Sequence, residues 1–96
     1  MDEVMLDIKF TKLAVEDLNN GYDYIYSENR SAAKEVIARI RSTLELLAAQ
    51  PFIGHPGRVE GTYEFYVLNT PFIVVYILEK DDLIIVSFLH TSRQYP

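Results

Sequence analysis

The sequence contains no cysteine and no tryptophan, and it has only four glycines and four prolines among its 96 residues. Without cysteine there is no disulfide framework and no thiolate metal site, a composition that fits a reducing compartment. Long hydrophobic runs are also lacking: the longest reach seven or eight residues, and a membrane-spanning helix needs about 20. The opening residues 1–4 are acidic where an export signal would be basic. We therefore expect a cytoplasmic protein with no membrane association.

Positive charge is scarce as well. Fourteen acidic residues face nine basic ones, which gives a formal net charge of -5. Such a balance acts against non-specific attraction to a polyphosphate, so direct nucleic-acid binding is not expected outside a local basic patch. The charge suits a basic protein partner, and it also serves solubility alone.

Motifs for metal or cofactor chemistry are missing too. The chain has no Gly-rich phosphate loop, no His-Glu-x-x-His metal motif and no nucleophile elbow. Its two histidines, His55 and His90, fall on different predicted elements. We therefore expect no bound metal and no cofactor.

The best-defined feature is the last third of the chain, where three apolar runs rich in Val, Ile, Phe and Tyr begin at Gly61, Pro71 and Leu83. Short polar breaks separate them, which predicts an antiparallel meander of three strands. Every position from Phe72 to Leu78 is apolar, so this run is predicted to be the central strand. The run from Tyr63 to Val67 places Glu64 between aromatic residues and is predicted to have one exposed face.

The first half predicts one more strand and two helices. Residues 5–10 alternate apolar and polar side chains, with Leu6, Ile8 and Phe10 on the predicted buried face. A helix over residues 12–27 follows, with Thr11 as its N-cap. Gly21 weakens this helix by about 1 kcal/mol relative to alanine, which indicates close packing there, most simply against the second helix.

The second helix starts after the capping residues 28–31 and ends before Pro51. Its short linker to the first helix predicts an antiparallel hairpin. Residues 50–61 are rich in Pro and Gly, so they are predicted to be a loop without regular structure, and this loop carries His55 and Arg58.

These elements predict one α+β domain over residues 1–96, in the order β-α-α-β-β-β. The helical hairpin should pack on one face of a mainly antiparallel four-stranded sheet. The predicted core between hairpin and sheet consists of Ile37, Ile40, Leu44, Ile73, Val75, Ile85 and Phe88.

Polar side chains at the strand ends are the candidates for function: Arg58, Tyr63, Tyr66, His90, Arg93 and Tyr95. Cleaving RNA without a metal requires a general base, a general acid and a cation for the charged phosphorane. His90, Tyr95 and the arginines offer these groups. A structural interpretation is also open, in which His90 hydrogen-bonds the backbone, Arg93 pairs with an acidic side chain and Tyr95 covers the sheet. On the residues alone, we favour the structural interpretation.

The ordered set of motifs resembles the ParE/RelE superfamily of bacterial toxins. The motifs are Ala14-x-x-Asp17-Leu18, Tyr24-Ile25, Ala32-Ala33, Pro51-x-Ile53-Gly54-x-x-Gly57, Gly61-Thr62-x-Glu64, Pro71-x-Ile73-Val74-x-Tyr76 and Leu89-His90-x-x-Arg93-Gln94-x-Pro96. They extend over nearly the whole chain, and the set is closer to ParE. The superfamily fold is β-α-α-β-β-β, in agreement with the order predicted above. One departure is Tyr63, which stands where the family commonly has arginine.

The resemblance implies a toxin of a plasmid-stabilisation-type module, neutralised by a cognate antitoxin that is ParD-like or another small DNA-binding protein. ParE-like members poison DNA gyrase, and RelE-like members cleave mRNA. We expect gyrase binding through Arg58, Tyr63, Tyr66, Arg93 and Tyr95. The alternatives are a metal-independent endoribonuclease that uses Arg58, His90, Arg93 and Tyr95, and a weakened relative that keeps only antitoxin binding.

Overall fold

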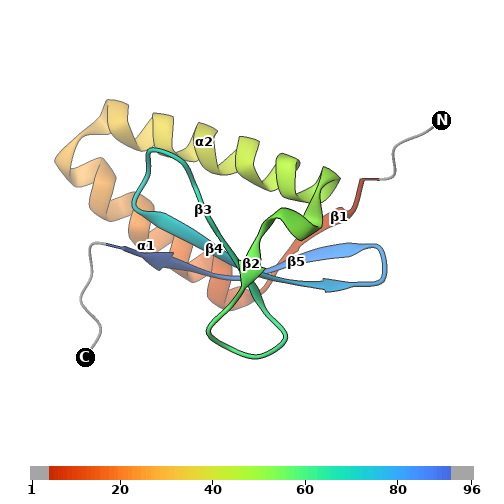
Figure 1. Ribbon diagram of the computed structural model, residues 1–96. Helices are drawn as coiled ribbons and strands as arrows, with labels where there is room; N and C mark the ends of the chain where they lie inside the picture. Colours follow the sequence, from red (N-terminus) through yellow and green to blue (C-terminus); the bar gives the residue numbers. More distant parts are fainter. Residues whose placement is uncertain (1–4, 92–96) are drawn as a thin grey trace.

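The computed structural model describes residues 5–91, in which a pair of helices packs against a mixed sheet (Figure 1). The elements are β1 (Asp7–Phe10), α1 (Lys12–Glu28), α2 (Arg30–Ala49), the 3-10 helix η1 (Pro51–Ile53), β2 (His55–Pro56), β3 (Tyr63–Tyr66), β4 (Phe72–Glu79) and β5 (Asp82–His90). The strand order is β1-β5-β4-β3-β2. β1 is parallel to β5, and the other pairs are antiparallel. The predicted α+β class and the central position of β4 are confirmed.

The sheet has five strands within the described residues, and the prediction of four was wrong. The segment predicted to be an irregular loop contains η1 and β2, whose two residues pair with Tyr63 and Glu64. Pro56 is compatible with this short strand because β2 lies at the sheet edge. The N–H that proline lacks is not needed there for hydrogen bonding within the inner strands.

Side-chain caps define the helical hairpin. Thr11 caps α1 as predicted, with its hydroxyl oxygen accepting a hydrogen bond from the Ala14 N–H at 3.0 Å. Asn29 alone separates the helices: its N–H donates to the Ile25 carbonyl at 2.8 Å, and its side chain accepts from the Ala32 N–H at 3.1 Å. One residue thus ends α1 and starts α2, which forces a tight reversal. Within residues 5–91, neither helix is long and apolar enough to cross a membrane.

A bulge in β5 is held by the start of α1. The register between β4 and β5 shifts at Val75/Tyr76, and Val86 has no cross-strand partner. The Thr11 hydroxyl donates to the Val86 carbonyl at 2.7 Å, and the Asp17 carboxylate accepts from the Phe88 N–H at 3.2 Å. These bonds satisfy backbone groups of β5 that lie beyond Ile85, where the pairing with β1 ends.

The main core lies between the helices and one face of the sheet. It contains Ile40, Leu44, Ile85 and Phe88, as predicted. The other three predicted members were placed wrongly. Ile73 and Val75 are buried but alternate with Phe72, Val74 and Tyr76, so they lie on the opposite face. Ile37 is only partly buried, because it lies at the margin of the hairpin's apolar stripe.

At the sheet edge, Leu6 and Ile8 pack on the core as predicted, whereas Phe10 is 44% exposed. β1 has a neighbour on one side only, so nothing in the sheet covers its outer edge. The predicted buried face is confirmed for Leu6 and Ile8. It was wrong for Phe10, which extends past the core.

Gly21 packs against the sheet. The prediction that it packs against the second helix was wrong. It is buried, and an added Cβ would overlap the ring of Phe72 in β4, lying 2.6 Å from its Cε1 atom. The missing side chain therefore makes room for a central strand residue.

Gly21→Ala is expected to lower the free energy of unfolding by about 1–3 kcal/mol, because overpacking of the Phe72 ring outweighs the better helix propensity of alanine. Urea denaturation measures the change. Asn20→Ala, at the exposed neighbouring position of α1, is the control and should stay within about 0.5 kcal/mol of the parent. A more stable Gly21→Ala variant would contradict the close contact.

Candidate functional site

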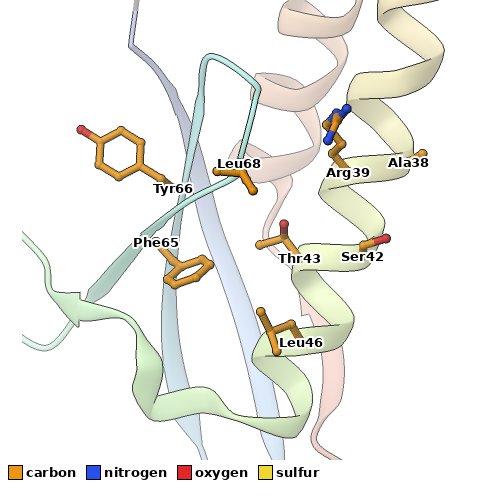
Figure 2. A pocket seen from close by; sticks show the side chains of 8 residues that line it. All are labelled: Ala38, Arg39, Ser42, Thr43, Leu46, Phe65, Tyr66 and Leu68. Carbon is orange, nitrogen blue, oxygen red and sulfur yellow. The ribbon is translucent and has the colours of Figure 1, made fainter.

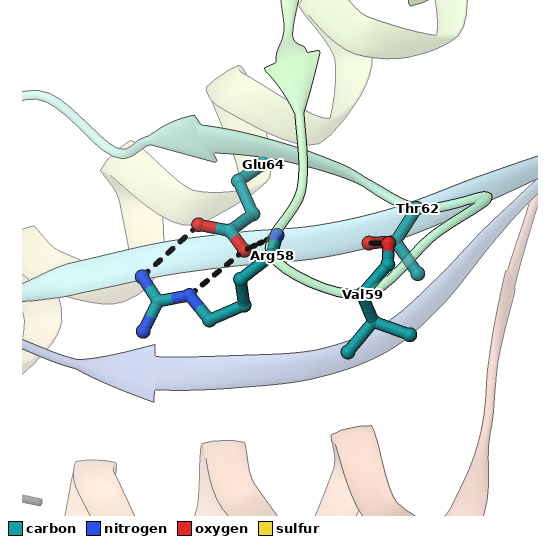
Figure 3. Close-up of polar contacts among 4 residues, drawn as sticks. All are labelled: Arg58, Val59, Thr62 and Glu64. Carbon is teal, nitrogen blue, oxygen red and sulfur yellow. Dashed lines mark hydrogen bonds and ion pairs between the residues drawn. The ribbon is translucent and has the colours of Figure 1, made fainter.

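The sheet face opposite the helices carries an ion pair between Arg58 and Glu64 (Figure 3). The guanidinium donates twice to the carboxylate, from Nε to Oε2 at 3.0 Å and from Nη2 to Oε1 at 3.1 Å. The backbone N–H of Arg58 adds a third bond to Oε2 at 2.9 Å. Glu64 is only 4% exposed, although its strand was predicted to expose this face. The loop before β3 folds back over the strand and covers it.

This environment changes the pKa of Glu64. Burial alone would raise the pKa of the carboxyl group, but the hydrogen bonds and positive charge of Arg58 outweigh burial, and the pKa lies below its ordinary value. Glu64 is therefore ionised at neutral pH, and the Arg58 guanidinium is oriented by a fixed carboxylate.

The loop that carries Arg58 is closed by its own hydrogen bonds. The Gly57 N–H donates to the Thr62 carbonyl at 2.7 Å. Figure 3 shows the second bond, in which the Thr62 hydroxyl donates to the Val59 carbonyl at 2.6 Å. Gly61 turns the chain with φ of 88°, in the left-handed region that favours glycine. These contacts hold Arg58 at a defined position over the sheet.

Tyr63 lies on the other face of β3 from Glu64. It pairs with Tyr76 across the strands, and the two rings stack with centroids 5.5 Å apart. The Tyr76 hydroxyl donates to the Pro51 carbonyl at 2.8 Å, and burial raises the pKa of Tyr76. Tyr63 is thus half-buried on a rigid aromatic pair that ties β4 to η1.

His90 ends β5 on the helix side of the sheet. Its ring lies 5.3 Å from the Phe72 centroid and 5.9 Å from the Tyr24 centroid of α1, edge-on to both. Only 8% of His90 is exposed. This places the imidazole inside the helix-sheet packing.

The structure therefore brings together only part of the predicted set. Arg58 and Tyr66 are on the face of the sheet away from the helices, since Glu64 and Tyr66 alternate with Tyr63 and Phe65 along β3. Tyr63 and His90 are on the helix side. Arg93 and Tyr95 lie outside the described residues.

A groove of about 540 Å³ lies between α2 and β3, and Figure 2 shows the side chains that line it. Its lining comes from Ala38, Arg39, Ser42, Thr43 and Leu46 of α2 and from Phe65, Tyr66 and Leu68. We call it the α2–β3 groove. The Phe65 and Leu68 side chains point toward α2, whereas the Tyr66 ring points away (Figure 2).

Sequence reasoning missed Glu64 as the partner of Arg58 and missed the groove residue Arg39. The available signal for the ion pair was the spacing: Arg58 precedes Glu64 by six residues, and two glycines lie near or within the intervening loop. Nothing in the local pattern of α2 distinguishes Arg39 from an ordinary solvated arginine. Within residues 5–91, no group of three or more acidic or histidine side chains is placed to hold a metal ion.

Comparison with known proteins agrees with this architecture. The family model described as ParE toxin of type II toxin-antitoxin system, parDE, matches residues 8–95. Y4kP, a candidate toxin of Sinorhizobium fredii, is 33% identical over 89 residues, which cover 93% of this chain and 92% of that protein.

Two solved structures share the fold. One is from the chromosomal ParDE TA system of P. aeruginosa, with a TM-score of 0.80, 21% identity, and coverage of 92% of this chain and 98% of that one. The other is from the toxin-antitoxin complex RelBE2 of Mycobacterium tuberculosis, with a TM-score of 0.65, 18% identity, and coverage of 96% and 98%. The family model spans nearly the whole chain, and the chain therefore belongs to the ParE toxin family of type II toxin–antitoxin systems.

Proposed function

We propose that this toxin acts by binding a protein target, with DNA gyrase as that target, and that it does not cleave RNA. The observation that carries the proposal is the separation of Arg58 from His90 by the sheet. A metal-independent nuclease needs its cation and its proton-transfer group around one phosphate. Here Arg58 and His90 are on opposite faces, so Arg58 is not placed to act on one phosphate together with His90, and His90 is inside the core.

The ion pair of Arg58 supports the same conclusion. Two of the five guanidinium N–H donors bond to Glu64, so the Arg58 charge is already paired with a carboxylate. In a phosphorane-stabilising site the cation strengthens its contacts as negative charge develops, whereas this guanidinium already neutralises a buried carboxylate. An arginine fixed in this way is suited to presenting a rigid surface to a protein partner.

Tyr63 and the overall charge favour a protein target as well. A tyrosine at this position offers one hydroxyl donor and no permanent charge, where an arginine would offer a permanent forked cation. The net charge of -5 opposes approach to a ribosome or a free RNA.

The proposed module includes an antitoxin that binds the toxin directly. The structurally similar proteins come from a ParDE system and from a RelBE2 toxin-antitoxin complex. Several large apolar side chains are exposed in the described part of this chain, among them Phe52, Tyr66 and Leu68. Burial of such surface by an antitoxin would stabilise a complex.

We expect the purified protein to inhibit DNA supercoiling by gyrase and to leave mRNA intact. Arg93→Ala should reduce gyrase inhibition about tenfold or more, the effect typical of losing a charged contact at an interface. Arg41→Ala, an exposed arginine on α2, is the control and should inhibit like the parent. Dose-response curves with purified gyrase and primer extension on reporter mRNA measure the two activities.

The order of events in cells separates the two mechanisms. Expression without an antitoxin should induce the DNA-damage response before translation stops. Rapid mRNA cleavage that disappears in His90→Ala or Arg93→Ala would overturn the proposal and establish an endoribonuclease.

A further inference from the structure

We propose that a second copy of this chain pairs with the open edge of β1 across a two-fold axis, so that the sheets of the two molecules join into one. The contact surface consists of the outer edge of β1 and an apolar groove beside it. It lies on the far side of the sheet from β3, because β1 and β2 are the two edge strands of the described sheet.

The first observation is a set of unused backbone groups on β1, which lies at the edge of the sheet (Figure 1). The N–H groups of Asp7 and Thr11 donate to carbonyls on the β5 side, at 2.8 and 3.0 Å. Successive residues of a strand direct their backbone groups to opposite sides, so the N–H and C=O groups of Ile8 and Phe10 point away from β5. No strand within residues 5–91 pairs with them.

The second observation is an apolar groove of about 420 Å³ beside this edge, which we call the β1 groove. Its apolar lining comes from Ile8 and Phe10 of β1, Leu18 of α1, and Ile37, Ile40 and Leu44 of α2. Phe10 is 44% exposed and Ile37 is only partly buried, although the sequence pattern predicts that both are buried. Two residues whose predicted burial fails in the single chain therefore line the same groove, which indicates that another molecule covers it.

The third observation is that the pattern of β1 complements itself. With Lys9 on the two-fold axis, Ile8 of each copy lies opposite Phe10 of the other, and each such pair exchanges its N–H···O bonds. Ile8 and Phe10 are on the helix side of the sheet, so the Phe10 ring of each copy enters the β1 groove of the other. A second β1 is already extended, so it loses less conformational entropy on pairing than a disordered segment would.

The charges on the other face of β1 fit the same arrangement. The Lys9 Nζ atom lies 3.0 Å from the Asp82 carboxylate of β5, so its charge is held over the sheet and not at the edge, where a lysine would oppose strand pairing. Asp7 has no ion pair within residues 5–91.

In the dimer, Asp7 lies diagonally across from Lys9 of the second copy, within reach of that long side chain. Each Lys9 is then flanked by two carboxylates, which offsets the proximity of the two lysines. The repulsion between two chains of net charge -5 is screened at physiological salt.

Sedimentation of the purified chain at rising concentration tests for the dimer. Because the contact is small, we expect a monomer at about 1 µM and a dimer as the concentration approaches about 1 mM. Phe10→Lys should weaken self-association by at least about tenfold, because it places a charge in the β1 groove of the other copy. Val59→Lys makes the same change of charge at an apolar residue that is 63% exposed and outside the groove lining. This matched control should associate like the parent.

Amide exchange in the parent chain locates the contact without depending on any variant. As the concentration rises, exchange of the Ile8 and Phe10 amides should slow by about fivefold or more. The Asp7 and Thr11 amides, which are bonded in the single chain, should change less. NMR of the labelled chain at low and high concentration measures all four amides.

Three results would contradict the assignment. A chain that stays monomeric up to about 1 mM does not form the dimer. A dimer that leaves the Ile8 and Phe10 amides unprotected, or in which Phe10→Lys and Val59→Lys associate alike, uses another surface. If these amides become protected only when the antitoxin is added, and the toxin alone stays monomeric, the edge of β1 binds the antitoxin and not a second copy. The measurements on the toxin alone are independent of gyrase, so their failure leaves the proposed target untouched.

Discussion

Phe72→Ala is expected to lower the free energy of unfolding by about 3–5 kcal/mol, the cost of removing a large buried aromatic side chain. Phe72 is 1% exposed in the central strand β4. Its ring packs on Gly21 and lies edge-on to two other rings. The ring centroids are 6.3 Å apart for Phe88 and 5.3 Å apart for His90. One substitution therefore loosens α1, β4 and β5 together.

Phe52→Ala is the matched control, because it deletes the same side chain where 76% of it is exposed. It should change stability by less than about 0.5 kcal/mol. Urea unfolding followed by circular dichroism measures both variants. Equal losses for Phe72→Ala and Phe52→Ala would show that the packing around β4 is not the main source of stability.

The parts of the fold that followed from sequence are those with long periodic patterns. The continuous apolar run of β4 indicated a strand covered on both faces, and the spacing of Ile37, Ile40 and Leu44 in α2 indicated a helix facing the sheet. The strand β2 could not be predicted in this way, since two residues that include a proline have no period. The pairing of β2 depends on the position of β3 in the folded chain.

The sequence did not predict correctly which residues of β4 face the helices, because its continuous apolar run covers both faces of the sheet. Every residue of β4 from Phe72 to Leu78 is apolar, so composition did not separate Val74, which faces the helices, from Ile73 and Val75, which face away. The partner of Gly21 was missed for a similar reason. A glycine in a helix signals a close neighbour, but Phe72 is far along the chain and sequence alone does not identify it.

In the candidate site too, one part could be predicted from the sequence and another part depends on tertiary contacts. The loop position of Arg58 followed from the surrounding prolines and glycines, whereas its bonds to Glu64 depend on how the loop folds back. Alternation placed Glu64 on the exposed side of β3, and the loop then covered that side. Alternation therefore assigned Glu64 to the correct face of β3. The sequence did not show that the Arg58 loop would bury that face.

Arg58→Ala is expected to destabilise the protein by about 2 kcal/mol at pH 7, because it leaves the buried Glu64 carboxylate without its cation. The Arg58 side chain is 64% exposed, and solvent screening keeps the loss below that of a fully buried pair. Arg41→Ala, at an exposed position of α2, should cost less than about 0.5 kcal/mol. Chemical denaturation of both variants gives the comparison.

The double variant Arg58→Ala/Glu64→Gln should be more stable than Arg58→Ala alone at pH 7, because the unpaired buried charge is gone. The pH dependence has a defined sign. Since the pKa of Glu64 is below its ordinary value of 4.5, the ionised pair contributes stability above about pH 4.5 and loses it as the pH falls through the folded-state pKa. The stability gap between the parent and Glu64→Gln should therefore be full at pH 7 and shrink below about pH 4. A gap that is constant from pH 7 to pH 3 would show that the Arg58–Glu64 pair does not act through the charge of Glu64.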